Sequence, residues 1–296
     1  VYGIGGNLIF PWYVGASCVL YAGPSRQAAA VLKAISTFKP TVFVSVPTIY
    51  SAILSLPNFY KRFDIGSLRM CISAGEPLPL QTWNTWKDAT EIEILDTIGC
   101  TETYHTFMAN RPGEVRPGSS GKPIRGYDVR LVDDEGKDVQ AGMVGNLMVR
   151  GESTALFYLH QSEKTRHSFR GEWLFTGDQY LQDKDGYYWH KGRVDDMLKV
   201  GGLWVSPMEI EEVLSGHDSI ADCAVVGHYD NAGLLKPKAF VCLRNGVEPS
   251  DELFEQLVKL CAKTLDAHKR PRWLEFNNDL PRTSTGKLQR FKLREQ

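Results

Sequence analysis

Two neighbouring side chains, Thr101 and Glu102, have the chemistry needed to bind a magnesium-bound nucleotide. The Thr101 hydroxyl can bind a phosphate, and the Glu102 carboxylate is a hard oxygen ligand of the kind that Mg²⁺ prefers. Gly99, just before them, lets a ligand approach the backbone closely. A Thr-Glu pair is common in proteins, so its role depends on the elements that position it.

A second segment, Ser73–Pro79, has the composition of a ligand-binding loop. Its small residues, with Gly75 among them, let a flat ligand lie against the backbone. An ordinary turn between a strand and a helix explains the same residues, and both interpretations stay open at this point.

The sequence around these two segments alternates between short apolar runs and helical periods. We predict helices over 26–38, after Pro47 and after Pro79, and strands over 41–46, 68–73 and 91–95. This alternation predicts a parallel sheet with crossover helices. Ligands of such sheets bind beyond the carboxyl ends of the strands, where both segments fall.

The flanking regions follow other patterns. Residues 110–127 are too rich in Gly and Pro for a regular element, and the runs 128–133 and 144–150 around the turn 134–136 predict a β-hairpin region. Residues 1–23 carry no charge, but glycines and Pro11 interrupt them and no basic residues precede them, so we expect a buried strand and the start of a helix rather than a membrane span or a signal peptide.

The character of the chain changes at Gly192–Pro207. A charged turn leads into the pair Gly201 and Gly202, and then into a helix start at which Ser206 and Glu209 have the spacing of a capping box. A hinge and a simple surface turn both fit. Beyond it, helices over 207–214 and 250–264 and strands over 221–226, 237–243 and 272–276 predict a small α+β unit.

Length and composition set the class of protein. The chain has 296 residues, 43% of them hydrophobic and 23% charged, which is ordinary for a globular protein. Its formal net charge of -1 gives no reason to expect nucleic acid or an anionic membrane as a partner. The six cysteines show no CxxC pair or metal-ligand spacing, which favours reduced core residues and a cytoplasmic location.

Six motifs occur in the order seen in adenylate-forming enzymes. They are Ser73-Ala-Gly-Glu, Asp96–Glu102, Gly145-Asn-Leu-Met-Val-Arg-Gly151, Trp173-Leu-Phe-Thr-Gly-Asp178, Gly192–Pro207 and Pro281-Arg-Thr-Ser-Thr-Gly-Lys287. The chain thus resembles the acyl- and aryl-CoA synthetases, the adenylation domains of peptide synthetases and the luciferases. Val1-Tyr-Gly-Ile-Gly, Ser45–Tyr50, Thr103–Phe107, Asp196–Pro207 and the end of the chain look most like benzoate-CoA ligases.

This resemblance implies an α/β fold with a β-rich region and a small mobile lid. It implies that a carboxylic acid reacts with MgATP to give an acyl-adenylate and pyrophosphate, after which the thiol of coenzyme A displaces AMP. The matching positions give Lys287, Thr101 and Glu102 as catalytic residues, with Glu102 on Mg²⁺. They give the following nucleotide-binding residues: Gly75, Glu76, Pro77, Asp96, Thr97, Ile98, Asp178 and Arg193. Tyr2, Ile98, Gly99 and His105 would contact the acid, Asp195 would be the hinge, and the side facing coenzyme A would comprise Lys199, Gly201, Gly202 and Trp204.

One family motif is missing, namely the Ser/Thr/Gly-rich phosphate loop with its lysine. We therefore expect a C-terminal portion of a longer enzyme, with part of the large domain at 1–194 and a lid at 195–296, and negligible activity for these residues alone. The resemblance implies an aryl-carboxylate CoA ligase that acts on benzoate or a substituted benzoate. The alternatives are a medium-chain or alicyclic acyl-CoA synthetase, an adenylation domain that loads a carrier protein, and a non-catalytic nucleotide-binding protein. The expected partners are the small acid, ATP, coenzyme A and the missing N-terminal half, with a homodimer possible, and Lys236 and Lys238 are further candidates for the phosphates of coenzyme A.

Overall fold

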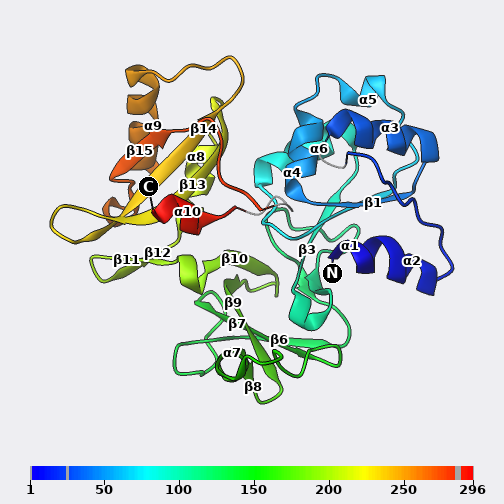
Figure 1. The fold of residues 1–296 in the computed structure, drawn as a ribbon, viewed down its shortest axis with the longest axis horizontal. Coiled ribbons are helices and arrows are strands. Elements are labelled where there is room, and N and C mark those ends of the chain that lie inside the picture. Colours follow the sequence, from blue (N-terminus) through cyan, green and yellow to red (C-terminus); the bar gives the residue numbers. More distant parts are fainter. Residues whose placement is uncertain (1, 25–26, 284–287, 296) are drawn as a thin grey trace. The chain divides into compact units, whose positions relative to one another are not determined.

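The computed structural model describes residues 2–24, 27–283 and 288–295 of the chain. Its contacts divide the chain into two compact units, Val1–His190 (unit 1) and Lys191–Gln296 (unit 2) (Figure 1). The sequence placed the boundary at 194/195, and the hinge at Asp195 stays a prediction.

The first sheet of unit 1 is a mixed five-stranded sheet. Strands β1 (Val42–Ser45), β2 (Met70–Ser73) and β3 (Ile94–Gly99) pair in parallel, and β4 (Thr106–Ala109) and β5 (Lys122–Pro123) follow in antiparallel pairing. The connecting helices are α3 (Ala28–Phe38), α4 (Pro47–Leu54), α5 (Phe59–Arg62) and α6 (Leu80–Thr90) (Figure 1). The predicted α/β class with crossover helices is confirmed.

Helices α3 to α6 pack on the sheet through regularly spaced apolar residues. In α3 the buried residues are Ala28, Val31, Leu32 and Ile35, the spacing of one helical face. Tyr50 of α4 is fully buried, and its hydroxyl donates to the carbonyl oxygen of Ile72 in β2 at 3.0 Å. These contacts fix β2 and β3, whose carboxyl ends carry the candidate ligand-binding segments.

Strand β3 differs from its prediction. It covers Ile94–Gly99 rather than 91–95, and Glu91 instead closes α6 in the left-handed region with φ of 61°. The extension arises because Thr97–Gly99 pair with β4, a contact that the sequence pattern did not reveal. Asp96, Thr97, Ile98 and Gly99 therefore lie on a strand and not in the loop that was expected.

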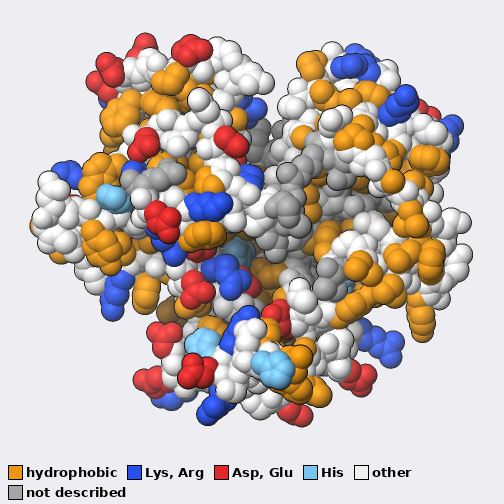
Figure 2. Space-filling model, viewed as in Figure 1, with side chains coloured by type: hydrophobic (Ala, Val, Ile, Leu, Met, Phe, Trp, Pro, Cys, Tyr) orange, Lys and Arg blue, Asp and Glu red, His pale blue; other side chains and the backbone are white. Residues whose placement is uncertain are grey.

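The N-terminal segment is helical. Residues Tyr2–Ile4 form α1, Gly5–Ile9 a π-helical turn η1, and Phe10–Tyr13 helix α2, so the predicted buried strand is wrong. Its apolar side chains are largely exposed, including Trp12 at 61% and Tyr13 at 89%, and Figure 2 shows hydrophobic side chains gathered over this part of the chain. In the part of the chain that the structure describes, no helix is both long and apolar enough to cross a membrane.

The second sheet of unit 1 is antiparallel, in the order β10-β9-β7-β6. It comprises β6 (Tyr127–Val132), β7 (Val144–Gly151), β9 (Trp173–Gln182) and β10 (Tyr188–Arg193), with β8 (Phe169–Arg170) beside β9 and helix α7 (Ser162–Ser168) before it. Strands β6 and β7 are the predicted hairpin, and the predicted β-rich region is confirmed.

Unit 2 has the predicted α+β character. The turn η3 (Val194–Asp196) and the hairpin β11 (Leu198–Val200) and β12 (Leu203–Val205) precede helix α8 (Pro207–Ser215). A three-stranded sheet follows, with β13 (Ile220–Tyr229), β14 (Leu235–Leu243) and β15 (Trp273–Phe276), and helix α9 (Asp251–Thr264), the turn η4 (Ala267–Lys269) and helix α10 (Arg290–Arg294) complete it. Gly201 and Gly202 form the hairpin turn with φ of 59° and 86°, as a two-residue turn of the I′ type requires.

The capping box predicted for α8 is wrong. Ser206 is the N-cap residue, but its hydroxyl donates to the carbonyl oxygen of Lys191 and makes no capping hydrogen bond. The Glu209 carboxylate instead accepts from Lys269 at 2.7 Å. The partners of both side chains come from elsewhere in unit 2, so the spacing of Ser206 and Glu209 in the sequence did not determine their hydrogen bonds.

Candidate active site

Two segments predicted to hold a nucleotide come from adjacent strands of unit 1. Ser73, the last residue of β2, pairs with Asp96 of β3, and the Thr97 hydroxyl donates to the carbonyl oxygen of Ser73 at 3.1 Å. Gly75–Pro77 follow directly after β2, and Gly75 has φ of 90°, a conformation that favours glycine. The structure therefore brings these two segments to one edge of the parallel sheet.

Asp96 is a buried carboxylate at this end of the sheet. It is only 7% exposed, and its Oδ1 has no hydrogen-bond partner among the described residues; the same holds for the buried Ser73 hydroxyl. Burial raises the pKa of Asp96 well above its usual range, against a smaller opposite effect of the Thr97 N–H. Because an unpaired buried polar atom is costly, these two groups can gain from the donors and acceptors of a ligand.

The predicted catalytic pair lies in the turn η2 (Thr101–Thr103), which follows β3. Thr101 is exposed and Glu102 is half-buried. Two contacts hold Glu102: the Ala155 N–H donates to its carbonyl oxygen at 2.7 Å, and the Tyr158 hydroxyl donates to its Oε1 at 2.6 Å. Burial raises the pKa of Tyr158 to about 12, with a further contribution from Glu102, so the phenol is a proton donor at neutral pH.

The residues present fit the Mg²⁺ that the sequence implies. Mg²⁺ usually binds through one or two carboxylates together with the phosphates of its substrate rather than in a cage of protein ligands. Glu102 can supply one such carboxylate beside the Thr101 hydroxyl, and within residues 2–24, 27–283 and 288–295 no group of three or more His, Cys, Asp or Glu side chains is arranged to hold a metal ion.

An aromatic cluster surrounds His105. Its ring stacks on Tyr2, with ring centroids 5.2 Å apart, and meets the edge of Phe10 at 4.7 Å. Two glycines make room for this residue: a Cβ on Gly5 would lie 2.4 Å from the His105 ring, and a Cβ on Gly99 would lie 2.2 Å from its carbonyl oxygen. Tyr2, Gly99 and His105 are thus brought together, whereas Ile98 packs against the core of the second sheet.

The hydrogen bonding of His105 defines its tautomer. Nε2 lies 3.0 Å from the carbonyl oxygen of Tyr2, which can only accept, so Nε2 carries the proton. Burial lowers the pKa of His105, and the Tyr2 carbonyl opposes this only in part. In the neutral ring the remaining nitrogen, Nδ1, therefore has a lone pair and no proton to donate.

Asp178 lies within β9. Gly177, with φ of 79°, and an irregular register between β7 and β9 break the regular strand beside it. The Asp178 carboxylate is 3.6 Å from Nε2 of His190. Tyr180 is buried close enough to both Asp178 and Asp96 that the two carboxylates add to the rise of its pKa, of which burial is the main cause.

The candidates of unit 2 are mostly exposed. Arg193 and Asp195 are exposed at the start of the unit, and Lys199, Gly201, Gly202 and Trp204 lie on the β11–β12 hairpin. Trp204 is 58% exposed, with the Lys199 ammonium 5.6 Å from its ring centroid. Lys287 lies outside the described residues. Lys238 is buried and paired with Glu275 at 3.0 Å, so its charge is already matched within unit 2.

Sequence reasoning missed an ion-pair network that joins the predicted hinge to helix α10. Arg290 binds Glu211 at 2.7 Å, and Arg294 binds Asp196 at 2.6 Å and the carbonyl oxygen of Asp195 at 3.2 Å. These partners are far apart in the sequence, and no local spacing signals them. The same is true of Tyr158 and Glu102.

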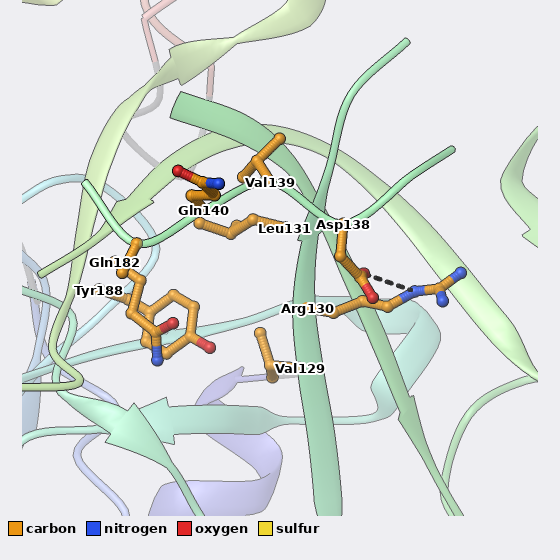
Figure 3. A pocket seen from close by; sticks show the side chains of 9 residues that line it. Val129, Arg130, Leu131, Asp138, Val139, Gln140, Gln182 and Tyr188 are labelled. Carbon is orange, nitrogen blue, oxygen red and sulfur yellow. Dashed lines mark ion pairs between the residues drawn. The ribbon is translucent and has the colours of Figure 1, made fainter. Parts of the chain in front are cut away.

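Neither of two cavities in the described chain is lined by a candidate residue of unit 1. One, of about 190 Å³, is formed by β6, Tyr188 and the loop that carries Asp138, where Arg130 and Asp138 are 3.9 Å apart (Figure 3). None of the predicted site residues lines it. The other, of about 450 Å³, lies in unit 2 and has a basic lining that includes Lys236, His268, Arg270 and Arg272, beside Val200 of the hairpin.

Comparison with known proteins gives one consistent family. The sequence profile of the AMP-binding enzymes matches residues 1–159, and that of the AMP-binding enzyme C-terminal domain matches residues 209–287. The benzoate-CoA ligase of Thauera aromatica is 45% identical over 294 residues, which cover 99% of this chain and 55% of the relative. The 4-hydroxybenzoate-CoA/benzoate-CoA ligase of Rhodopseudomonas palustris is 43% identical over 297 residues, covering 99% and 54%.

The comparison with solved structures points to the same family of enzymes. The anthranilate CoA ligase AuaEII in complex with anthranoyl-AMP superposes with a TM-score of 0.94 at 56% identity, over 99% of this chain and 57% of the other. A benzoate CoA ligase from Burkholderia xenovorans LB400 gives 0.92 at 44% identity, over 99% and 58%. The chain spans about half the length of these relatives. The predicted resemblance to adenylate-forming enzymes, and to benzoate-CoA ligases among them, is confirmed, and the chain belongs to the AMP-binding enzyme family.

Proposed function

We propose that this chain is part of an aryl-carboxylate CoA ligase, which activates benzoate or a substituted benzoate with ATP and transfers the acyl group to coenzyme A. The observation that carries this proposal is the meeting, around β3 of unit 1, of the nucleotide candidates at Ser73–Pro77 and Asp96 with the aromatic cluster of His105, Tyr2 and Phe10. Relatives that bear the names of benzoate, hydroxybenzoate and anthranilate CoA ligases support it.

In the first step, the acid oxygen attacks the α-phosphorus of ATP and pyrophosphate leaves. Asp96 and Ser73, whose buried polar atoms lack partners in the described chain, would bind the adenine edge, and the Asp178 carboxylate would accept the ribose hydroxyls. Thr101 would donate to a phosphate oxygen, and Glu102 would hold Mg²⁺. When bound, the metal neutralises phosphate charge, and Lys287 would add a cation as charge develops.

In the second step, the thiolate of coenzyme A attacks the acyl carbon and AMP leaves. The exposed hairpin with Lys199, Gly201, Gly202 and Trp204 would face the thiol substrate. The basic cavity beside Val200 fits the phosphates of coenzyme A, because Lys236, His268 and Arg272 line it. Arg270 lines it as well, although its guanidinium already donates to the carbonyl oxygens of Leu265 and Ala262.

The tautomer of His105 favours an acid whose ring bears a hydrogen-bond donor. A carboxylate can only accept, so it is a poor partner for the unprotonated Nδ1, whereas a ring amine or hydroxyl can donate to it. We therefore propose that His105 contacts a ring substituent rather than the carboxylate. The 56% identity with an anthranilate CoA ligase makes 2-aminobenzoate the first acid to test.

The test is acid-dependent pyrophosphate release and acyl-CoA formation by the full-length enzyme. We expect anthranilate and benzoate to exceed hexanoate at least tenfold in kcat/KM, with anthranilate preferred. His105→Phe should remove the preference for anthranilate while benzoate still reacts. A preference for hexanoate would point to a medium-chain acyl-CoA synthetase, and transfer to a carrier protein in place of coenzyme A would point to a loading domain; either result contradicts the proposal.

The remaining expectations belong to the same proposal. The six free cysteines, four of them buried, agree with action in the cytoplasm. Mg²⁺ dependence, homodimer formation and the hinge at Asp195 stay predictions for the full-length enzyme.

A further inference from the structure

The segment between β7 and α7 contacts the predicted metal ligand at two points. The Ala155 N–H donates to the backbone carbonyl of Glu102, and the Tyr158 hydroxyl donates to the Glu102 carboxylate at 2.6 Å. The first contact fixes the backbone of the turn η2 and the second fixes the side chain. Glu102 is therefore held in position before any ligand is present.

Tyr158 is itself held on several sides. Its N–H donates to the Thr165 hydroxyl at 3.0 Å, its ring meets the edge of Phe169 at 5.4 Å, and the Lys164 ammonium lies 4.0 Å from the ring centroid. These contacts leave the side chain of Tyr158 little freedom to move, so its hydroxyl stays where it meets the Glu102 carboxylate. The two neighbours of Tyr158, Phe157 and Leu159, are 59% and 70% exposed, so the tyrosine between them is less exposed than either.

We propose that Tyr158 is a positioning residue for the reaction, which holds one oxygen of Glu102 so that the other is directed to the magnesium of MgATP. This inference rests on the proposed function of Glu102 and adds a residue that no sequence motif had singled out. An O–H donor to a carboxylate is a strong, directional hydrogen bond. Groups that orient a metal ligand in this way typically change metal affinity or activity 10- to 100-fold when they are removed.

The chain offers a matched control in Tyr127. Its hydroxyl donates to the carbonyl oxygen of Thr103 in the same turn, at 3.2 Å, and it does not contact the Glu102 carboxylate in the structure. Tyr127→Phe and Tyr158→Phe each remove one hydroxyl beside η2 and keep the ring. A difference between them therefore isolates the contact with the carboxylate from general support of the turn.

The experiment measures, in the full-length enzyme, the Mg²⁺ concentration for half-maximal adenylation and the binding of Mn²⁺·ATP by electron paramagnetic resonance. Tyr158→Phe should weaken both about 10-fold, Glu102→Gln more strongly, and Tyr127→Phe by less than twofold. Conversion of preformed acyl-adenylate to thioester should be unchanged in Tyr158→Phe.

The inference would be overturned by an unchanged metal dependence in Tyr158→Phe, or by equal losses in both half-reactions together with a lower melting temperature, which marks a merely structural role. Equal effects of Tyr127→Phe and Tyr158→Phe would do so too. If the wild-type enzyme activates no aryl acid, the proposed function fails, but Mn²⁺·ATP binding still tests the role of Tyr158.

Discussion

The candidate residues of the two units differ in how they are held. In unit 1, Asp96 is 7% exposed, and Glu102, His105 and Thr97 each have a hydrogen-bond partner from another part of the unit. In unit 2, Trp204 is 58% exposed, and its neighbours Gly201 and Gly202 form the tip of a hairpin. The candidate residues of unit 1 are thus held in place by other parts of the unit, whereas those on the hairpin of unit 2 are exposed.

Stability is the first place to test this difference, because unit 2 also contains a largely buried ion pair between Glu211 of α8 and Arg290 of α10. Glu211→Ala leaves Arg290, with a side chain 21% exposed, without its main partner, and removal of one member of a buried pair costs roughly 3–5 kcal/mol. Denaturant unfolding should show this loss. Asp185→Ala breaks an exposed pair with Arg116 in unit 1 and should cost less than about 1 kcal/mol. Equal losses would show that the network is not buried in solution.

Lys287→Ala should have the largest effect on catalysis. Loss of one group that stabilises developing charge lowers the rate about 10²–10³-fold, so pyrophosphate exchange should fall by that factor. Thioester formation from preformed acyl-adenylate should be nearly unchanged. Lys292→Ala, which removes an exposed lysine on α10, serves as the control. Equal loss in both half-reactions would contradict the role of Lys287.

Trp204→Ala should affect the two half-reactions in the opposite way to Lys287→Ala. It removes an exposed aromatic surface from the hairpin, and we expect kcat/KM for coenzyme A to fall roughly tenfold, equivalent to about 1.4 kcal/mol. Adenylation should be unaffected. Phe254→Ala removes an aromatic side chain that is 40% exposed on α9 and should change neither step. A loss confined to adenylation would place Trp204 with the nucleotide residues instead.

The smallest expected effect is a pH dependence of stability that belongs to unit 1. Burial lowers the pKa of His105 below its ordinary value of 6.5, so the unfolded chain takes up this proton more readily than the folded one. The stability contributed by neutral His105 is complete above pH 6.5 and is lost as the pH falls through the folded pKa. Melting temperatures of His105→Gln should therefore fall less steeply with acidification than those of wild type. His160→Gln, which removes a histidine from an exposed loop, serves as the control.

The parts of the fold that the sequence predicted well are those set by local pattern. Helix α3 and strands β1 and β2 follow from apolar spacing, and the glycine pair at 201–202 marks a turn. The length of β3 could not be predicted, because it depends on pairing with β4. The N-terminal helix was missed because its apolar residues do not alternate between a buried and an exposed side.

The residue types of the candidate site could be predicted from the sequence, but the residues that hold them in position could not. Glu102 stands out by its chemistry, while Tyr158 lies 56 residues away and Arg294 lies 98 residues from Asp196. Such contacts arise only when distant elements fold together. The capping box at Ser206 failed for the same reason, since Lys191 and Lys269 bind the two side chains instead.

The ends of the segment that carries Lys287 are fastened to the body of unit 2. Arg282 and Leu288 form an antiparallel bridge, Arg282 also binds Asp222 of β13, and the side chain of Leu288 packs against a core that includes Phe240. Arg282 and Leu288 are therefore held to the sheet of unit 2 by contacts of three kinds, a backbone bridge, an ion pair and apolar packing.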